Sequence, residues 1–365
     1  MTTLTVEKSK IFANLEVIRA AAGDAQLIAV LKANAYGLDL RQMAALLREQ
    51  EVRRFAVTDP QDAVNLREWG FTEEEILVLR STALEEDIRR ILDAGATATV
   101  GSYDAAVALS GMAEKENMLC DVHIKIDTGM GRYGFAPNEL DRILSVYRFL
   151  SNLSVTGMYT HFANAFRDKK KTQAQYDALV EVAEKVRAAG FDPGLLHAAN
   201  SAGLLFCRVP ALDAVRIGSA IGGRMTAKGE FGLQKTGRLE SAVCEVRWLQ
   251  KGAAVGYGSA FTCKRPTRIA VIPVGSTDGI LLEKGRDSLR FRDCFRAALG
   301  AMAAPLRGKR PTVAIGGKRA RILGHVGLNH TVADVTDLDC NVGAAAVFDV
   351  SPIYVPAGIP RVYTD

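Results

Sequence analysis

Short runs of apolar and β-branched residues recur through the first two thirds of the chain. Eight of these runs predict strands, at residues 27–31, 54–57, 76–79, 97–100, 121–126, 155–159, 195–198 and 214–217. The segments between them carry apolar residues at helical spacing, most clearly at 40–48, 61–69, 85–92, 103–113 and 172–188. Because strands that alternate with helices form parallel sheets, eight such units predict a closed (β/α)8 barrel, the TIM barrel. An amphipathic segment at 6–20 predicts an extra helix before the first strand.

The pattern changes after about Gly232. Runs at 241–249, 268–274, 312–315, 322–326 and 345–350 are separated by glycine-rich turns, and long helical segments largely vanish. This change predicts a second domain that is mostly β. We therefore expect an α/β protein with a TIM barrel over residues 1–232 and a mostly β C-terminal domain over residues 233–365. The first few residues are expected to pair with the second domain.

Composition narrows the class of protein. The chain has 365 residues, 48% of them hydrophobic, and a net charge of +5. The basic runs at 169–171 and 318–321 lack interleaved aromatic residues, which favours solvated surfaces over a nucleic-acid site. The six cysteines form no CxxC pair, and no apolar run is long enough to predict a signal core or a membrane span. A cytoplasmic protein with reduced thiols is the default expectation.

Ionisable and polar residues collect where the predicted barrel strands end. They are Lys32 after the first strand, Lys125, Asp127 and Arg132 around the end of the fifth, His161 after the sixth, His197, Asn200 and Ser201 after the seventh, and Arg216 and Gly218 at the eighth. Each residue alone has an ordinary interpretation as a surface charge, a packing residue or a helix cap. Together they predict an active site, because TIM barrels carry their active sites at the C-terminal ends of the strands.

The last two barrel strands carry the signs of a phosphate site. Asn200 and Ser201 precede a predicted short helix, whose N-terminus favours anions. Gly218 and Ser219 follow the eighth strand, and their small side chains let backbone N–H groups approach a ligand closely. A lysine across the rim, Lys32, then suggests a phosphate-bearing aldehyde held as an imine.

Seven segments make the interpretation specific. They are AVLKANAYG (29–37), KIDTGMGRYGF (125–135), GMYTHFA (157–163), HAANSAG (197–203), RIGSAIG (216–222), VGYGSAF (255–261) and PRVY (360–363). In this order they resemble the motifs of the alanine racemase family, which are pyridoxal 5'-phosphate enzymes of fold type III. The lysine motif alone is also similar to that of related decarboxylases and of a single-domain cofactor-binding family. The VGYG motif separates the racemases from the single-domain family.

The resemblance implies two acid–base groups on opposite faces of the cofactor. Lys32 matches the lysine that carries the cofactor, and Tyr257 matches a second base that the neighbouring subunit supplies. Racemisation needs a proton removed from one face of the α-carbon and returned on the other. The family pattern therefore implies a homodimer with shared active sites and a small amino-acid substrate.

Further matches assign roles around the cofactor. Arg216 matches the residue that faces the pyridine nitrogen, to which an arginine can only donate. His161 matches a histidine packed on the cofactor ring, and His197 one that orients Arg216. Tyr36, Ser201 and the backbone of Gly218 and Ser219 match phosphate contacts, and Asn200 is a further expected cofactor-binding residue.

Two matches concern the substrate side. Arg132 matches a residue that polarises the second base and holds the substrate carboxylate. Lys125 matches a lysine that is often carbamylated in the family, which turns a cation into an anion. No metal is implied.

The chain departs from the family pattern at the passage to the site, so it resembles a divergent member of the family. YGLD (36–39) replaces the usual YGHG, and GSTDG (275–279) places Ser276 where a tyrosine is usual. Leu328 and Asn329 replace a methionine–aspartate pair, with Leu328 expected beside the substrate. Tyr354 is a candidate replacement for a tyrosine that contacts phosphate.

The leading hypothesis is alanine racemisation that supplies D-alanine for cell-wall synthesis. One alternative keeps the chemistry and changes the substrate to serine or a larger amino acid. Another is an amino-acid decarboxylase, against which Arg216 and Tyr257 argue. A non-catalytic pyridoxal-phosphate-binding protein is the alternative from a different class.

Overall fold

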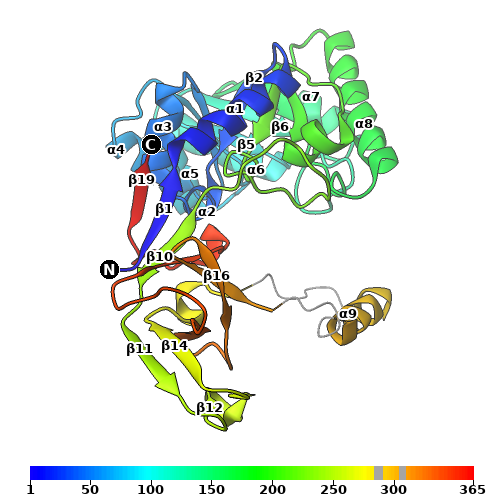
Figure 1. Ribbon diagram of the computed structural model, residues 1–365. Helices are drawn as coiled ribbons and strands as arrows, with labels where there is room; N and C mark the ends of the chain where they lie inside the picture. The colour runs from blue at the N-terminus through cyan, green and yellow to red at the C-terminus, as the bar shows by residue number, and fades with distance from the viewer. Residues whose placement is uncertain (283–290, 304–309) are drawn as a thin grey trace. The chain divides into compact units, whose positions relative to one another are not determined.

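The computed structural model describes residues 1–282, 291–303 and 310–365 in two compact units (Figure 1). One unit is Lys8–Lys235, and the other combines Met1–Glu7 with Thr236–Asp365. No helix in the described part of the chain is long and apolar enough to cross a membrane.

The first unit confirms the predicted barrel. Eight parallel strands close on themselves in chain order: β2 (Gln26–Val30), β3 (Arg54–Val57), β4 (Glu75–Val78), β5 (Thr97–Val100), β6 (Cys120–Lys125), β7 (Leu153–Tyr159), β8 (Leu195–Asn200) and β9 (Ala214–Ile217). The helices around them are α1 (Lys8–Ala22), α2 (Lys32–Tyr36), α3 (Leu40–Glu49), α4 (Pro60–Glu68), α5 (Glu85–Asp93), α6 (Tyr103–Lys115), α7 (Leu140–Phe149) and α8 (Lys169–Ala188).

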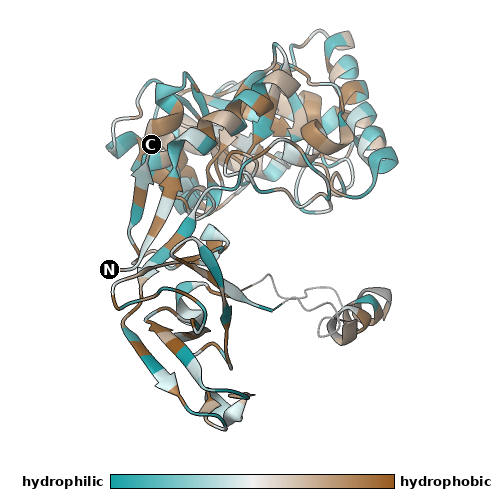
Figure 2. Ribbon diagram, viewed as in Figure 1, coloured by the Kyte–Doolittle hydropathy of each residue, from teal (hydrophilic) through white to brown (hydrophobic). Residues whose placement is uncertain are grey.

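Local signals explain where these helices begin. The Ser102 and Asp168 side chains accept the backbone N–H groups of Ala105 and Lys171, so they cap α6 and α8. Pro60 occupies the first position of α4, where its missing N–H costs nothing. Hydrophilic residues dominate the visible face of α8 (Figure 2), and its buried residues, such as Leu179 and Val182, lie at helical spacing.

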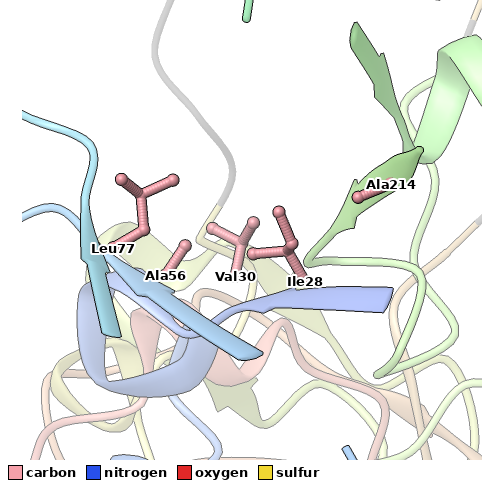
Figure 3. Packing of buried hydrophobic residues seen from close by; sticks show 5 residues of the cluster. All are labelled: Ile28, Val30, Ala56, Leu77 and Ala214. Carbon is pink, nitrogen blue, oxygen red and sulfur yellow. The ribbon is translucent and has the colours of Figure 1, made fainter. Parts of the chain in front are cut away.

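One side of the barrel interior is apolar. Ile28, Val30, Ala56, Leu77 and Ala214 form a buried cluster. Figure 3 shows the labelled side chains of neighbouring strands on one side of the sheet. We call this cluster the apolar side of the lumen. Branched aliphatic residues are the usual filling of a TIM barrel.

The second unit is built on a nine-stranded sheet in the order β11-β14-β17-β16-β15-β18-β10-β1-β19. Its strands are β1 (Thr3–Glu7), β10 (Arg238–Ala242), β11 (Glu245–Leu249), β14 (Thr267–Ile272), β15 (Thr312–Ile315), β16 (Lys318–Ile322), β17 (Thr331–Asp334), β18 (Ala345–Phe348) and β19 (Arg361–Thr364). The unit also contains a hairpin of β12 (Ala254–Val255) and β13 (Phe261–Thr262) and the helix α9 (Phe291–Ala303).

Several predicted boundaries were wrong. The helix expected at 6–20 begins at Lys8, because Val6 and Glu7 belong to β1, which pairs with β10 and β19. The run at 241–249 divides into two strands, and of the run at 322–326 only Ile322 is in a strand. The strands β17 and β19 were not predicted, since each is short and lacks a long apolar run.

Candidate active site

A cavity of about 360 Å³ opens at the C-terminal ends of the barrel strands. Its walls are mixed: apolar residues such as Val30 and Leu79 alternate with polar groups. Ten of the residues expected from the sequence line it: Lys32, Tyr36, Lys125, Arg132, His161, Asn200, Ser201, Arg216, Gly218 and Ser219. Segments up to about 190 positions apart thus converge at one place, as the barrel rule requires.

Lys32 begins a short left-handed turn. Residues 33–36 have φ between 52° and 57°, and Gly37 follows with φ 82°. Left-handed backbone costs L-residues roughly 1–2 kcal/mol each, so neighbouring contacts must hold it. The Asn34 side chain does so by accepting the Leu40 N–H at 2.7 Å. Both Lys32 and Tyr36 reach the cavity from this turn, which is the kind of strain that functional sites retain.

The Lys32 amine is shifted toward its neutral form. Burial, and then the charge of Arg132, lower the pKa of Lys32 from its usual range. A neutral amine is the form that attacks a carbonyl or accepts a proton.

Tyr36 and Gly218 form a matched pair. The Tyr36 hydroxyl accepts the backbone N–H of Ser219, and burial raises the pKa of Tyr36 to about 12, so the phenol keeps its proton as a donor. A Cβ at position 218 would lie 2.2 Å from the Tyr36 hydroxyl oxygen. Only glycine therefore allows the hydroxyl and this backbone to meet.

Arg216 is buried in the barrel, and no carboxylate of the described residues forms an ion pair with its guanidinium. Its Nη1 donates to His197 Nδ1 at 2.8 Å and to the His197 carbonyl at 3.0 Å, and its Nη2 donates to the Thr160 carbonyl at 2.6 Å. Burial lowers the pKa of Arg216 to about 10, which leaves it charged at neutral pH. Within the described residues Nε makes no hydrogen bond, so it is the donor left for a ligand in the cavity.

Two more cations face the cavity. Lys125 is 1% exposed, and its Nζ donates to the Tyr133 carbonyl. Burial lowers the pKa of Lys125 to about 8; Asp127 opposes this shift, whereas Arg132 and Arg216 add to it. The Arg132 guanidinium lies 4.8 Å from the centre of the Tyr133 ring. Asp127 itself is held by the backbone N–H groups of its own loop.

His161 is neutral in this surrounding. Burial, followed by the charges of Arg216, Lys32, Arg132 and Lys125, lowers the pKa of His161 to about 3. The ring therefore offers an uncharged flat surface to the cavity.

Two details of the predicted strand ends were wrong. His197 does not follow the seventh barrel strand; it lies within β8, fully buried below the cavity. Asn200 is the last residue of β8, and its side chain accepts the Gly203 N–H at 2.8 Å. The short helix beyond it includes a π turn, Gly203–Cys207, and not a regular α-helix.

The sequence interpretation missed a set of buried polar residues that join the site. Tyr159 stacks on His197 with ring centres 4.7 Å apart, and its hydroxyl lies 3.0 Å from Thr99 Oγ1. His123 lies below, 2.8 Å from His197. We call the buried set of His123, Lys125, Tyr159 and His197 the polar side of the lumen. The only signal was polar residues at alternating positions in buried strands.

Tyr257 belongs to the second unit, where it is 82% exposed. It starts a 3-10 turn, Tyr257–Ser259, between β12 and β13. A buried cluster that includes Val255, Cys263 and Leu323 lies at the base of this hairpin. The tyrosine is therefore exposed at the end of a hairpin whose base is packed against buried residues.

The residues expected at the substrate passage meet within the second unit. The Ser276 N–H donates to the Gly327 carbonyl at 2.9 Å, and the Thr277 hydroxyl donates to the Leu328 carbonyl at 2.7 Å. Leu328 itself is 69% exposed. Tyr354 ends a separate 3-10 turn, Pro352–Tyr354.

The donor set of the cavity fits a phosphate-bearing aromatic aldehyde. Tyr36 and the close backbone at Gly218 form a cradle that a Cβ would fill, next to the polar side chains of Asn200 and Ser201. The unpaired Arg216 Nε suits a ring nitrogen acceptor, and Lys32 supplies an amine. Among the described residues no cluster of histidine, cysteine and acidic side chains could hold a metal ion.

Two family models match the chain. The model described as alanine racemase, N-terminal domain, matches residues 6–225, and that of the C-terminal domain matches residues 236–351. Curated relatives agree. The alanine racemase of Clostridium tetani is 32% identical over 290 residues, which span 77% of this chain and 74% of the relative. That of Methanococcus maripaludis is 30% identical over 348 residues, or 93% and 86% of the two chains.

Solved structures agree with the fold. The alanine racemase of Clostridium difficile superposes with a TM-score of 0.85 at 25% identity and covers 100% of this chain and 95% of its own. An alanine racemase of Streptomyces lavendulae gives a TM-score of 0.84 at 23% identity, with 100% and 97% covered, which supports the shared fold alone.

Proposed function

Because the chain belongs to the alanine racemase family, we propose that it interconverts L-alanine and D-alanine with pyridoxal 5'-phosphate as its cofactor. The observation that carries the proposal is a single barrel cavity that joins the Lys32 amine, the Tyr36–Gly218 cradle and the unpaired Nε of Arg216. These three features match the aldehyde, phosphate and ring nitrogen of that one cofactor.

The residues that line the cavity would hold the cofactor. Lys32 would bind its aldehyde, while Tyr36, Asn200, Ser201 and the backbone of Gly218 and Ser219 would bind its phosphate. His161 would pack on the ring, and Arg216 Nε would donate to the ring nitrogen. When bound, pyridoxal phosphate withdraws electrons from the substrate α-carbon and makes its proton acidic. Arg216 stays protonated at neutral pH, so it can donate a hydrogen bond to the ring nitrogen but does not transfer a proton to it. A ring nitrogen without a proton would accept less negative charge from the substrate.

Two bases move the proton. The lowered pKa of Lys32 makes its Nζ available as a proton acceptor on one face of the α-carbon. The hydroxyl oxygen of Tyr257 of the partner subunit serves the opposite face, which requires a homodimer. The high exposure of Tyr257 on its hairpin supports this role.

Arg132 holds the substrate carboxylate, and Lys125 orients Arg132. Because burial lowers the pKa of Lys125 to about 8, roughly a tenth of its amine is neutral at pH 7, far more than for an ordinary lysine. Its neutral amine adds to carbon dioxide and releases one proton, which gives a carbamate anion. This anion pairs with the Arg132 guanidinium, so dialysis against buffer free of carbon dioxide is expected to weaken substrate binding.

A stereochemical assay tests the proposal. Purified protein loaded with pyridoxal phosphate should abolish the optical activity of L-alanine and release no carbon dioxide. Release of carbon dioxide would favour a decarboxylase, and binding without turnover would favour a non-catalytic binder.

Subunit mixing tests the shared site. Lys32→Ala and Tyr257→Phe are each expected to be inactive, and subunits exchanged between them should recover activity because one hybrid site keeps both bases. A persistently monomeric species with full activity would contradict the homodimer.

Serine is the second candidate substrate. Ser276 stands in the loop that contacts the exposed Leu328 loop, where the family pattern has a larger tyrosine. A smaller side chain there favours acceptance of side chains larger than methyl. A role in supplying D-alanine for cell-wall synthesis in the cytoplasm stays a prediction.

A further inference from the structure

A column of polar side chains crosses the barrel interior below the cavity. Arg216 Nη1 lies 2.8 Å from His197 Nδ1, and His197 Nε2 lies 2.8 Å from His123 Nδ1. His123 Nε2 in turn faces Glu75 Oε1 at 3.9 Å, and Glu75 is ion-paired with Arg54. Arg54 and Glu75 begin β3 and β4, at the opposite mouth of the barrel. The interior of such a barrel is usually filled with apolar side chains. Buried polar groups are costly unless they are hydrogen-bonded, so this column is unusual and points to a function.

Hydrogen-bonding capacity fixes the direction of the column. Arginine can only donate, so His197 Nδ1 must accept and the His197 proton must reside on Nε2. His197 then donates to His123 Nδ1, which places the His123 proton on Nε2, toward Glu75. Both rings are neutral, since burial lowers the pKa of His123 to about 3 and that of His197 well below its usual value. Every N–H in the column therefore points away from the cavity.

The surrounding residues leave little room for either ring to turn. A Cβ on Gly157 would lie 2.6 Å from His123 Nε2, so only glycine admits the ring at this position. His197 stacks on Tyr159 at an interplanar angle of 12° and meets His123 edge to face. Both histidines are nearly inaccessible, at 1% and 0% exposure.

We propose that His123 is a positioning residue for the cofactor site. By accepting the His197 Nε2–H it stabilises the one His197 tautomer that can accept from Arg216 Nη1, and so holds Arg216 with its Nε facing the cavity. The Glu75 carboxylate supports the arrangement by attracting the His123 Nε2–H. His123 touches neither cofactor nor substrate, and it acts only through His197 and Arg216. The consequence for turnover rests on the proposed function; the tautomer assignment does not.

Nitrogen NMR of histidine tests the tautomer directly. The chain has only five histidines, so protein labelled with ¹⁵N-histidine gives few signals, and His→Gln variants assign them. At pH 7, with or without added cofactor, His123 and His197 should both show the neutral Nε2–H pattern. A protonated His197, or one with its proton on Nδ1, would overturn the proposal even if the protein is an active racemase.

Two substitutions separate hydrogen bonding from packing. His123→Gln keeps an acceptor for His197 and a donor for Glu75, whereas His123→Leu fills similar space with neither. We expect His123→Gln to retain the His197 pattern and most of the turnover. His123→Leu should disturb the pattern and lower kcat for racemisation about tenfold, a size typical of residues that orient an active-site group, with little change in KM.

Leu77→Ala is the matched control, since it disturbs the apolar side of the same lumen. It should lower stability without altering the His197 signal or kcat. Equal His197 signals and equal kcat in His123→Leu and His123→Gln would show that His123 only fills space. If His123→Leu fails to fold, the proposal is still tested by the tautomer of His197 measured in the unsubstituted protein.

Discussion

The two sides of the barrel lumen are buried to a similar degree, but one is filled with apolar side chains and the other with hydrogen-bonded polar side chains. The apolar side, built from Ile28, Val30, Ala56, Leu77 and Ala214, excludes water and gains stability in proportion to the buried area. The polar side buries His123, Lys125, Tyr159 and His197 at comparable depth.

Burial of polar groups is tolerable only when their hydrogen bonds are made. In the part of the chain that the structure describes, none of the buried side-chain atoms without a partner lies on the polar side. We therefore expect stability and function to be divided between the two sides of one barrel. Substitutions on the apolar side should change folding, and those on or above the polar side should change chemistry.

The largest effect is expected from Lys32→Ala, at the cavity above the lumen. Removal of the amine takes away both the cofactor linkage and one base, so racemisation should fall by roughly 10³-fold or more, with little change in the melting temperature. Borohydride reduction and peptide mapping of the unsubstituted protein check the assignment. Label on a different lysine would refute it.

Leu77→Ala should have the next largest effect, on stability alone. Leu77 is 1% exposed, and its truncation leaves a cavity that costs about 2–5 kcal/mol. Urea unfolding measures the loss, and kcat per folded molecule should stay within twofold. A large fall in kcat with unchanged stability would break the division between the two sides.

Acid should destabilise the folded protein through the buried histidines of the polar side. The folded-state pKa of His123 is about 3, below the ordinary value near 6.5, so below pH 6.5 the unfolded chain binds a proton that the folded protein does not. The resulting contribution of His123 to the free energy of unfolding is fully present above pH 6.5. It falls as the pH drops toward 3, by up to about 1.4 kcal/mol per pH unit for one such group.

A buried-histidine variant isolates this contribution. Between pH 6.5 and 5, His123→Gln should lose about 1.6 kcal/mol less than the unsubstituted protein, as measured by urea midpoints at the two pH values. Leu77→Ala serves as the control, because its unfolding free energy should keep the original pH slope. Identical slopes in all three proteins would mean that His123 takes up its proton in the folded protein over the same pH range as in the unfolded chain.

The smallest effect lies outside the barrel. Ser276→Tyr restores a ring at the expected substrate passage, so the ratio of kcat/KM for L-alanine to that for L-serine should rise about tenfold, within the range that a few apolar atoms provide. Stability and cofactor binding should not change. An unchanged ratio, with alanine as the only substrate of the original protein, would exclude a widened passage.

The hydrophobic pattern alone predicted most of the barrel. The strands at 54–57, 97–100 and 214–217 have the predicted limits in the structure, because fully buried parallel strands appear as short apolar runs between helical segments. The strand-end rule then predicted which polar residues meet at the cavity, since parallel strands bring their C-terminal ends to one rim.

Only the tertiary structure determined the contacts that cross the barrel. His123 and His197 are 74 positions apart and bond through the register of three parallel strands, which no local pattern records. The left-handed turn after Lys32 likewise depends on contacts such as that between Asn34 and Leu40, because non-glycine residues do not favour it by themselves. The sequence determined which residues reach the site; packing across the lumen decided how Arg216 is held there, since hydrogen-bond direction follows from three-dimensional neighbours.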